Sequence, residues 1–182
     1  MTRYISTKEV AAMLRHDLKA MWPGVKFSVR MSTGTASAWI HVHTIDGPTD
    51  REVRAVTARF EGRSFDGMTD SYTDHGTQLI VLEGEELPEE TRFSCDGINT
   101  QRSFSHAAYV HVQSMIDDGG FSEIRVLNEK GEPDYRTAIP SDIAFRGSYY
   151  DYVYSPAGLA DRILHDIDLT PITAAPPRAT RK

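Results

Sequence analysis

Residues 25–43, VKFSVRMSTGTASAWIHVH, predict a β-hairpin with one buried face. On each side of a turn at residues 32–35, every second residue is apolar. The apolar series is Val25, Phe27, Val29, Met31, Ala36, Ala38, Ile40 and Val42, and the series between them is Lys26, Ser28, Arg30, Ser37, Trp39, His41 and His43. Successive side chains of a strand point to opposite faces, so the first series should pack into a core and the second should face solvent.

Helix-capping signals flank the hairpin. The predicted starts are Ser6 or Thr7 with Glu9, Thr49 with Glu52, Ser105, and Pro156. The first two are capping boxes, because a Glu follows the Ser or Thr at the third position. Gly62 is the predicted C-cap of the second helix.

Helices and short strands together predict an α+β fold, in which amphipathic helices cover one face of a mostly antiparallel sheet. Further short strands are expected at residues 78–83, 92–95, 123–127 and 135–139, the first with a buried apolar run, Leu79–Leu82. The order helix, two strands, helix occurs over residues 7–61 and again over 105–168. The domain could therefore consist of two αββα halves. We expect residues 1–169 to form a single domain and residues 170–182 to be a disordered basic tail.

The composition limits the classes of partner and compartment. The 182 residues contain 26 Asp and Glu against 20 Lys and Arg, a net charge of -6 that weighs against a general phosphate-binding surface but is compatible with a local basic patch. The single cysteine, Cys95, cannot form an intramolecular disulfide, which fits a reducing compartment. The N-terminus lacks the apolar segment of a signal peptide. A cytoplasmic location is therefore expected.

Two groups of residues could hold a metal ion, and each has a plainer interpretation. His41 and His43 share a strand face and could bind zinc with Asp74 or His75, but a solvent-facing strand shows the same spacing. Asp66, Asp70 and Asp74 are spaced by four around a turn that contains Gly67, and they could bind a divalent ion or act as an acid and base pair. Turn chemistry is favoured for them, with Asp accepting backbone hydrogen bonds and Gly67 supplying a positive φ. No cofactor is expected.

An interaction surface is the other expectation. The residues that could form it are Arg30, Trp39, Arg102, Tyr150 and Tyr152, because Trp, Tyr and Arg supply most interface hot spots. The tyrosines could instead pack beneath the last helix. The sequence contains no nucleophile-elbow, Walker or dinucleotide-binding motif, so a binding protein is favoured over an enzyme.

Several ordered segments resemble the large polyvalent protein associated domain family, member twenty-nine. They are Tyr4-Ile5-Ser6, Trp22 to Arg30, Asp46-Gly47-Pro48-Thr49, Phe60-Glu61-Gly62, Phe65-Asp66-Gly67-Met68, and Ile98 with Gln101-Arg102-Ser103-Phe104-Ser105. The resemblance implies an accessory protein of phages or conjugative elements that assists invading DNA, and it assigns no catalytic residue.

Three functions follow from the residues and the resemblance. The favoured one is an inhibitor, of the anti-CRISPR or antirestriction type, that binds a host defence protein or ribonucleoprotein complex. The second is a nucleic-acid-binding accessory using Arg30, Arg102 and the basic tail. The third is a metal-dependent enzyme using His41, His43 and a carboxylate.

Overall fold

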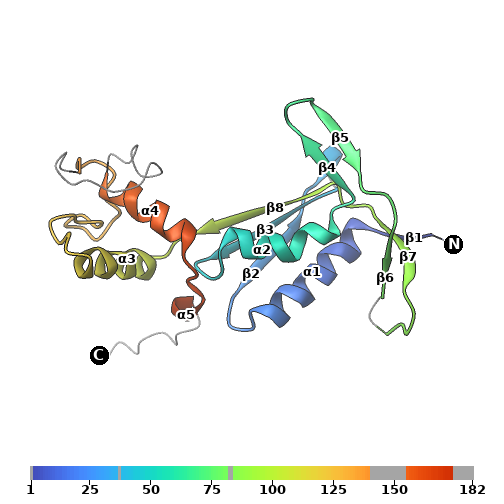
Figure 1. The fold of residues 1–182 in the computed structure, drawn as a ribbon, viewed down its shortest axis with the longest axis horizontal. Coiled ribbons are helices and arrows are strands. Elements are labelled where there is room, and N and C mark those ends of the chain that lie inside the picture. Colours follow the sequence, from blue (N-terminus) through green and yellow to red (C-terminus); the bar gives the residue numbers. More distant parts are fainter. Residues whose placement is uncertain (1, 37, 82–83, 140–154, 174–182) are drawn as a thin grey trace. The chain divides into compact units, whose positions relative to one another are not determined.

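The computed structural model describes residues 2–36, 38–81, 84–139 and 155–173 (Figure 1). These residues form five α-helices, eight strands and two short 3-10 helices, which confirms the α+β fold. The chain divides into two compact units. The first takes the residues up to Thr44 together with Asp50–Gln101, and the second takes Ile45–Thr49 together with the residues from Arg102 onward. That residues 1–169 behave as one domain stays a prediction.

The main sheet of the first unit has the strand order β2-β3-β8. The predicted hairpin supplies β2 (Phe27–Met31) and β3 (Trp39–Ile45), joined through the 3-10 helix η1 (Gly34–Ala36). Their antiparallel register places Arg30 opposite His41. The third strand, β8 (Gly97–Ser103), has no counterpart among the strands predicted from the sequence.

Two helices, α1 (Thr7–Met21) and α2 (Asp50–Thr57), lie on the same side of this sheet (Figure 1). Their apolar side chains pack with the inward series of the strands in one core. That core includes Val10, Leu14, Leu18, Val29, Ile40, Val42, Val53, Phe60, Phe93, Cys95 and Ile98. The hairpin therefore buries Val25, Val29, Ile40 and Val42 of the predicted inward series. The prediction is wrong for Met31, the last residue of β2, which is 38% exposed.

The capping box of α1 is confirmed. The Ser6 N–H donates to Glu9 Oε2 at 2.8 Å, and the Glu9 N–H donates to Ser6 Oγ at 3.3 Å. Both bonds satisfy donors that have no partner inside the helix.

Substituting Ser6→Ala should therefore lower the free energy of unfolding by about 1 kcal/mol, as is typical for loss of an N-cap side chain. Urea unfolding followed by circular dichroism measures this. Ser114→Ala, at an exposed position inside a helix, is the matched control and should cause no loss, because alanine has the higher helix propensity. Equal losses in the two variants would contradict a capping role for Ser6.

A second, smaller sheet of the first unit has the order β1-β7-β6. Here β1 (Arg3–Ile5) runs parallel to β7 (Glu89–Phe93), and β6 (Gln78–Ile80) pairs with β7 in the antiparallel sense. The prediction that the Leu79–Leu82 run is buried is wrong for Leu79 and Val81, which are 75% and 57% exposed, and Leu82 lies outside the described residues. The strand is short and lies at the sheet edge, so Leu79 points outward while Ile80 packs against the core. A separate hairpin pairs β4 (Arg63–Asp66) with β5 (Ser71–Asp74).

Gly62 has a different role from the predicted C-cap. Helix α2 ends at Thr57 and is followed by the 3-10 helix η2 (Ala58–Phe60). Gly62 then approaches β7 so closely that an added Cβ would lie 2.2 Å from the Phe93 carbonyl oxygen. Its N–H donates to the Cys95 carbonyl at 2.7 Å. This contact therefore requires glycine at position 62.

The second unit contains the helices α3 (His106–Asp118), α4 (Pro156–Asp166) and α5 (Thr170–Thr173). Their core includes Ala108, Tyr109, Val112, Ile116, Ile124, Val126, Leu159, Ala160, Leu164 and Leu169. The side chains of Ser105 and Ser155 cap α3 and α4, and Pro156 occupies the first turn of α4, which confirms both predicted starts. The prediction of a disordered tail from residue 170 is wrong for Thr170–Thr173, which form α5. Residues 174–182 of the predicted tail lie outside the described residues.

The strands predicted at 123–127 and 135–139 are not formed. Residues 121–139 make turns with one isolated bridge, between Leu127 and Pro133. The side-chain amide of Gln113 takes the hydrogen bonds that a neighbouring strand would make, because it accepts from the Val126 N–H at 2.7 Å and donates to the Ile124 carbonyl at 2.9 Å. Within the described residues, the αββα order is therefore found only in the first half of the chain; residues 140–154 lie outside them.

Candidate functional site

One face of the main sheet carries four of the residues predicted to bind or ligate. Within the described part of the first unit, the helices α1 and α2 lie on the opposite side of the sheet (Figure 1). The side chains that alternate with the core residues therefore point away from both helices. We call the surface that they form the open sheet face. It consists of Arg30, Trp39, His41, His43, Asn99 and Gln101.

The open sheet face is accessible at each of these positions within the described structure. Arg30, His41, Asn99 and Gln101 are exposed, and Trp39 and His43 are half-buried. The strands β2, β3 and β8 contain no Asp or Glu, although the whole chain contains 26 such residues. These three strands therefore contribute no negative charge to the open sheet face.

Trp39 lies directly on the backbone of Gly97. A Cβ added to Gly97 would meet the Cζ3 and Cη2 atoms of the Trp39 ring at 2.5 and 2.6 Å. Only glycine lets the six-membered ring of the indole rest on the neighbouring strand at this distance. The contact also fixes the face of β8 on which Asn99 and Gln101 lie, since they follow Gly97 at intervals of two residues.

Asn99 and Gln101 were not predicted from the sequence. The β8 segment has one aliphatic side chain, Ile98, in its first five residues, so alternating hydrophobicity gives almost no signal there. The sequence does contain one indication of a strand here. Asn99, Thr100 and Gln101 follow Ile98 without a Pro or Gly that would interrupt a strand.

Three of the four predicted zinc ligands, His41, Asp74 and His75, are each engaged in separate contacts. His41 Nε2 lies 2.8 Å from the hydroxyl of Ser32, while the other predicted ligands are engaged elsewhere: Asp74 accepts from the Gly76 N–H at 2.7 Å and pairs with Arg92. His75 Nδ1 lies 3.0 Å from the Glu61 carbonyl oxygen. In the part of the chain that the structure describes, no three His, Cys, Asp or Glu side chains come together as a metal centre would need.

Asp66 and Asp70 form the turn of the β4–β5 hairpin. Asp66 accepts from the Met68 N–H and from the Thr69 hydroxyl, each at 2.9 Å, and these bonds hold the pKa of Asp66 below its usual range. The residue with positive φ is Asp70, at 50°, and not Gly67 as predicted. Asp is one of the non-glycine residues that tolerate this conformation. The contacts support turn chemistry for Asp66.

Arg102 is buried in the second unit and is only 9% exposed. Its Nε donates to the Asp46 carbonyl at 3.1 Å, and its terminal nitrogens donate to the carbonyls of Leu164, Gly47 and Ile167 at 2.8, 2.7 and 2.9 Å. The last turn of α4 leaves carbonyls unsatisfied at its negative end, so a cation there is favourable. These contacts support a structural role for Arg102 and not the predicted place on an interaction surface.

The other two predicted surface residues, Tyr150 and Tyr152, lie outside the described residues. A tyrosine cluster that was not predicted occurs instead in the second unit. Asp161 accepts from the hydroxyls of Tyr109 and Tyr135 at 2.7 and 2.9 Å. Burial, together with these neighbours, raises the pKa of Tyr109 well above its usual range, so its phenol stays protonated.

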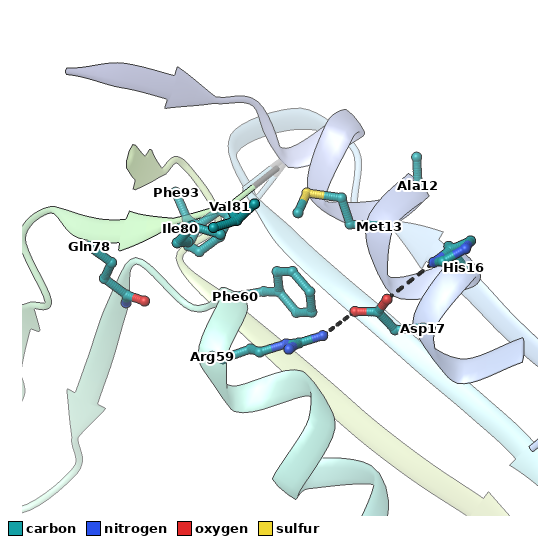
Figure 2. Close-up of a pocket in the computed structure, with 10 residues that line it drawn as sticks. All are labelled: Ala12, Met13, His16, Asp17, Arg59, Phe60, Gln78, Ile80, Val81 and Phe93. Carbon is teal, nitrogen blue, oxygen red and sulfur yellow. Dashed lines mark hydrogen bonds and ion pairs between the residues drawn. The ribbon is translucent and has the colours of Figure 1, made fainter. Parts of the chain in front are cut away.

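A groove of about 600 Å³ lies in the first unit between α1, η2 and the strands β6 and β7 (Figure 2). Its floor is apolar, with Met13, Phe60, Ile80 and Phe93 among its lining residues. At one side Arg59 forms an ion pair with Asp17, and the Arg59 guanidinium lies 4.7 Å from the centre of the Phe60 ring. His16, whose side chain is 67% exposed, also lines the groove beside Asp17. The rest of the lining offers mainly apolar contact.

Cys95 belongs to the core of the first unit and is fully buried. Burial is the main cause that raises the pKa of its thiol to about 11. The thiol is therefore protonated near neutral pH, and a nucleophilic role is not supported.

No helix among the described residues is sufficiently long and apolar to cross a lipid bilayer.

The fold defines the class of this protein as an α+β protein, and in the described part of its first unit helices cover one face of the main sheet. The model of the family described as large polyvalent protein associated domain 29 matches residues 5–105, which is more than half of the chain, and the chain therefore belongs to this family. Domains of this family are associated with polyvalent proteins of phages and mobile elements. Comparison with curated proteins and with solved structures gives no match.

Proposed function

We propose that this chain is a non-enzymatic accessory protein of a phage or conjugative element and that it counters host defence by binding a defence complex through the open sheet face. The partner is a host defence protein or ribonucleoprotein complex, so the protein is an inhibitor of the anti-CRISPR or antirestriction type. It acts in the host cytoplasm, where Cys95 stays reduced.

The observation that carries this proposal is the composition of the open sheet face. Trp and Arg are among the residues that most often dominate binding energy at protein interfaces, and Trp39 and Arg30 both belong to this one surface. The association of the family with phage and mobile-element proteins supports the biological setting.

Protection of invading DNA tests the proposal. Host strains that each carry one defined restriction or CRISPR system are challenged with a targeted plasmid, with and without the full chain. We expect the chain to raise plasmid establishment in at least one strain, and Arg30→Glu to reduce that gain about tenfold or more by placing a like charge against the partner's anionic contact. Arg51→Glu is the matched control on α2 and should keep the gain. Lack of protection in every strain would refute the proposal.

A further inference from the structure

The open sheet face combines an aromatic platform with a cation and a row of amides. Trp39 lies on the central strand and rests on Gly97 of β8. Arg30 lies on β2 at the other side of the central strand, opposite His41. Asn99 and Gln101 follow Gly97 along β8. An aromatic surface, a positive charge and hydrogen-bonding side chains are thus present on one face.

The charge of this surface is complementary to a polyanion. None of the residues in β2, β3 and β8 is acidic, whereas the chain as a whole has a net charge of -6. Among the described residues no ion pair engages the Arg30 guanidinium, whereas ion pairs engage Arg3, Arg54, Arg59, Arg63, Arg92 and Arg125. Lys26, which precedes β2 and continues the alternation of Ser28 and Arg30, is exposed as well.

We propose that the open sheet face binds a single strand of nucleic acid, with one base stacked on Trp39, the phosphate backbone held at Arg30 and base edges contacted by Asn99 and Gln101. This inference rests on the proposed function, because it names the chemical class of the partner at the same surface. The strand is the nucleic acid that a defence complex holds as its guide or its target.

The geometry favours a single strand over a duplex. Bases stack on an aromatic side chain only when they are unpaired and splayed out, as they are on the sheet surfaces of single-strand-binding modules. Duplex DNA is read by elements that protrude into its grooves, whereas this surface consists of three adjacent strands. An acidic protein surface could form ion pairs with Arg30. It would not stack on the Trp39 ring, which rests on Gly97.

Fluorescence anisotropy of the full chain with labelled oligothymidylate and oligouridylate of about twelve nucleotides tests the inference. We expect binding that weakens about fivefold to tenfold between about 50 and 200 mM salt, as neutralisation of about two phosphates would cause. Trp39→Ala should weaken binding about tenfold or more through loss of stacking. Preference for one of the two oligonucleotides shows that the surface responds to the 2′-hydroxyl or to the thymine methyl group, the two features that distinguish them.

Control variants separate these effects from general damage. Arg51→Gln and Tyr72→Ala remove a cation and an exposed aromatic ring outside the open sheet face, and they should leave binding unchanged. If Trp39→Ala does not fold, Arg30→Gln and Asn99→Ala, at exposed positions, test the same surface and should each weaken binding. Absence of oligonucleotide binding, equal binding of duplex DNA or polyglutamate, or indifference to the face variants would overturn the inference.

This experiment can fail independently of the proposed function. Protection of invading DNA that depends on Arg30, without oligonucleotide binding, would refute the single strand as partner and leave the proposed function intact. Oligonucleotide binding without protection in any strain would refute the proposed function and would leave the single strand of nucleic acid as the ligand of the open sheet face.

Discussion

Substituting Gly62→Ala is expected to lower the free energy of unfolding of the first unit by about 3 kcal/mol or more, because the new Cβ cannot be accommodated. It would lie 2.2 Å from the Phe93 carbonyl oxygen and 3.2 Å from that of Cys95. Both are backbone atoms, which cannot turn aside as a side chain can. Relief requires separating η2 from β7 and loses the hydrogen bond from the Gly62 N–H to the Cys95 carbonyl.

Urea unfolding followed by tryptophan fluorescence measures this effect, since Trp22 and Trp39 both belong to the first unit. Gly67→Ala is the matched control, because its added Cβ would meet no atom closer than 3.8 Å. We expect the control to change stability by no more than about 0.5 kcal/mol. A loss below about 1 kcal/mol for Gly62→Ala would show that the close approach to β7 is not as described.

The second large effect is expected for Arg102→Ala, which should destabilise the second unit by about 3–5 kcal/mol. Four backbone carbonyls would lose the Arg102 donor, and each group left unsatisfied carries a desolvation penalty. The Gly47 carbonyl would keep its bond from the Leu169 N–H at 2.8 Å. Arg102→Lys should recover part of this loss, because an ammonium supplies the charge but not the planar fork of donors.

Hydrogen exchange of the α4 amides measures this destabilisation within the second unit. The matched control is Arg125→Ala in the same unit, where the arginine side chain is 65% exposed and lies 3.6 Å from Asp117. Exposed ion pairs of this kind contribute little, so protection of α4 should be nearly unchanged in the control. Equal protection in Arg102→Ala and Arg125→Ala would contradict the structural role of Arg102.

Helices and the hairpin were predictable because their signals are local. The Ser6–Glu9 capping box, the serine caps of α3 and α4, and the strict alternation from Phe27 to Val42 each operate within a few residues. Strands β1 and β8 were missed because their pairing comes from distant segments. Arg3 pairs with Thr91, and β8 joins the sheet beside β3. Tertiary context determines such strands more than their own residues do.

The wrong strand at 123–127 shows how a side chain can replace a pairing partner. Ile124 and Val126 have the alternation of a half-buried strand, and both are indeed buried. Gln113 of α3 satisfies the backbone between them, so no second strand is needed. The sequence contains nothing that would reveal this exchange, because Gln113 appears only as a polar residue on a helix.

The family segments quoted from the sequence have physical roles in the structure. In Phe60-Glu61-Gly62, Phe60 is in the core, Glu61 accepts from the Ile98 N–H at 2.9 Å, and Gly62 makes the close approach to β7. Asp46 and Gly47 have positive φ values of 56° and 74° and turn their carbonyls toward Arg102. These two segments therefore maintain the fold.

Nuclear magnetic resonance of the isotopically labelled full chain, titrated with the oligothymidylate, tests most directly that the open sheet face is the binding surface. We expect the largest shift changes at the Trp39 indole and at the side-chain amides of Asn99 and Gln101, with little change at Met13 and Phe60 of the groove. Changes centred on the groove or on the helices of the second unit, with the Trp39 indole unaffected, would contradict this account.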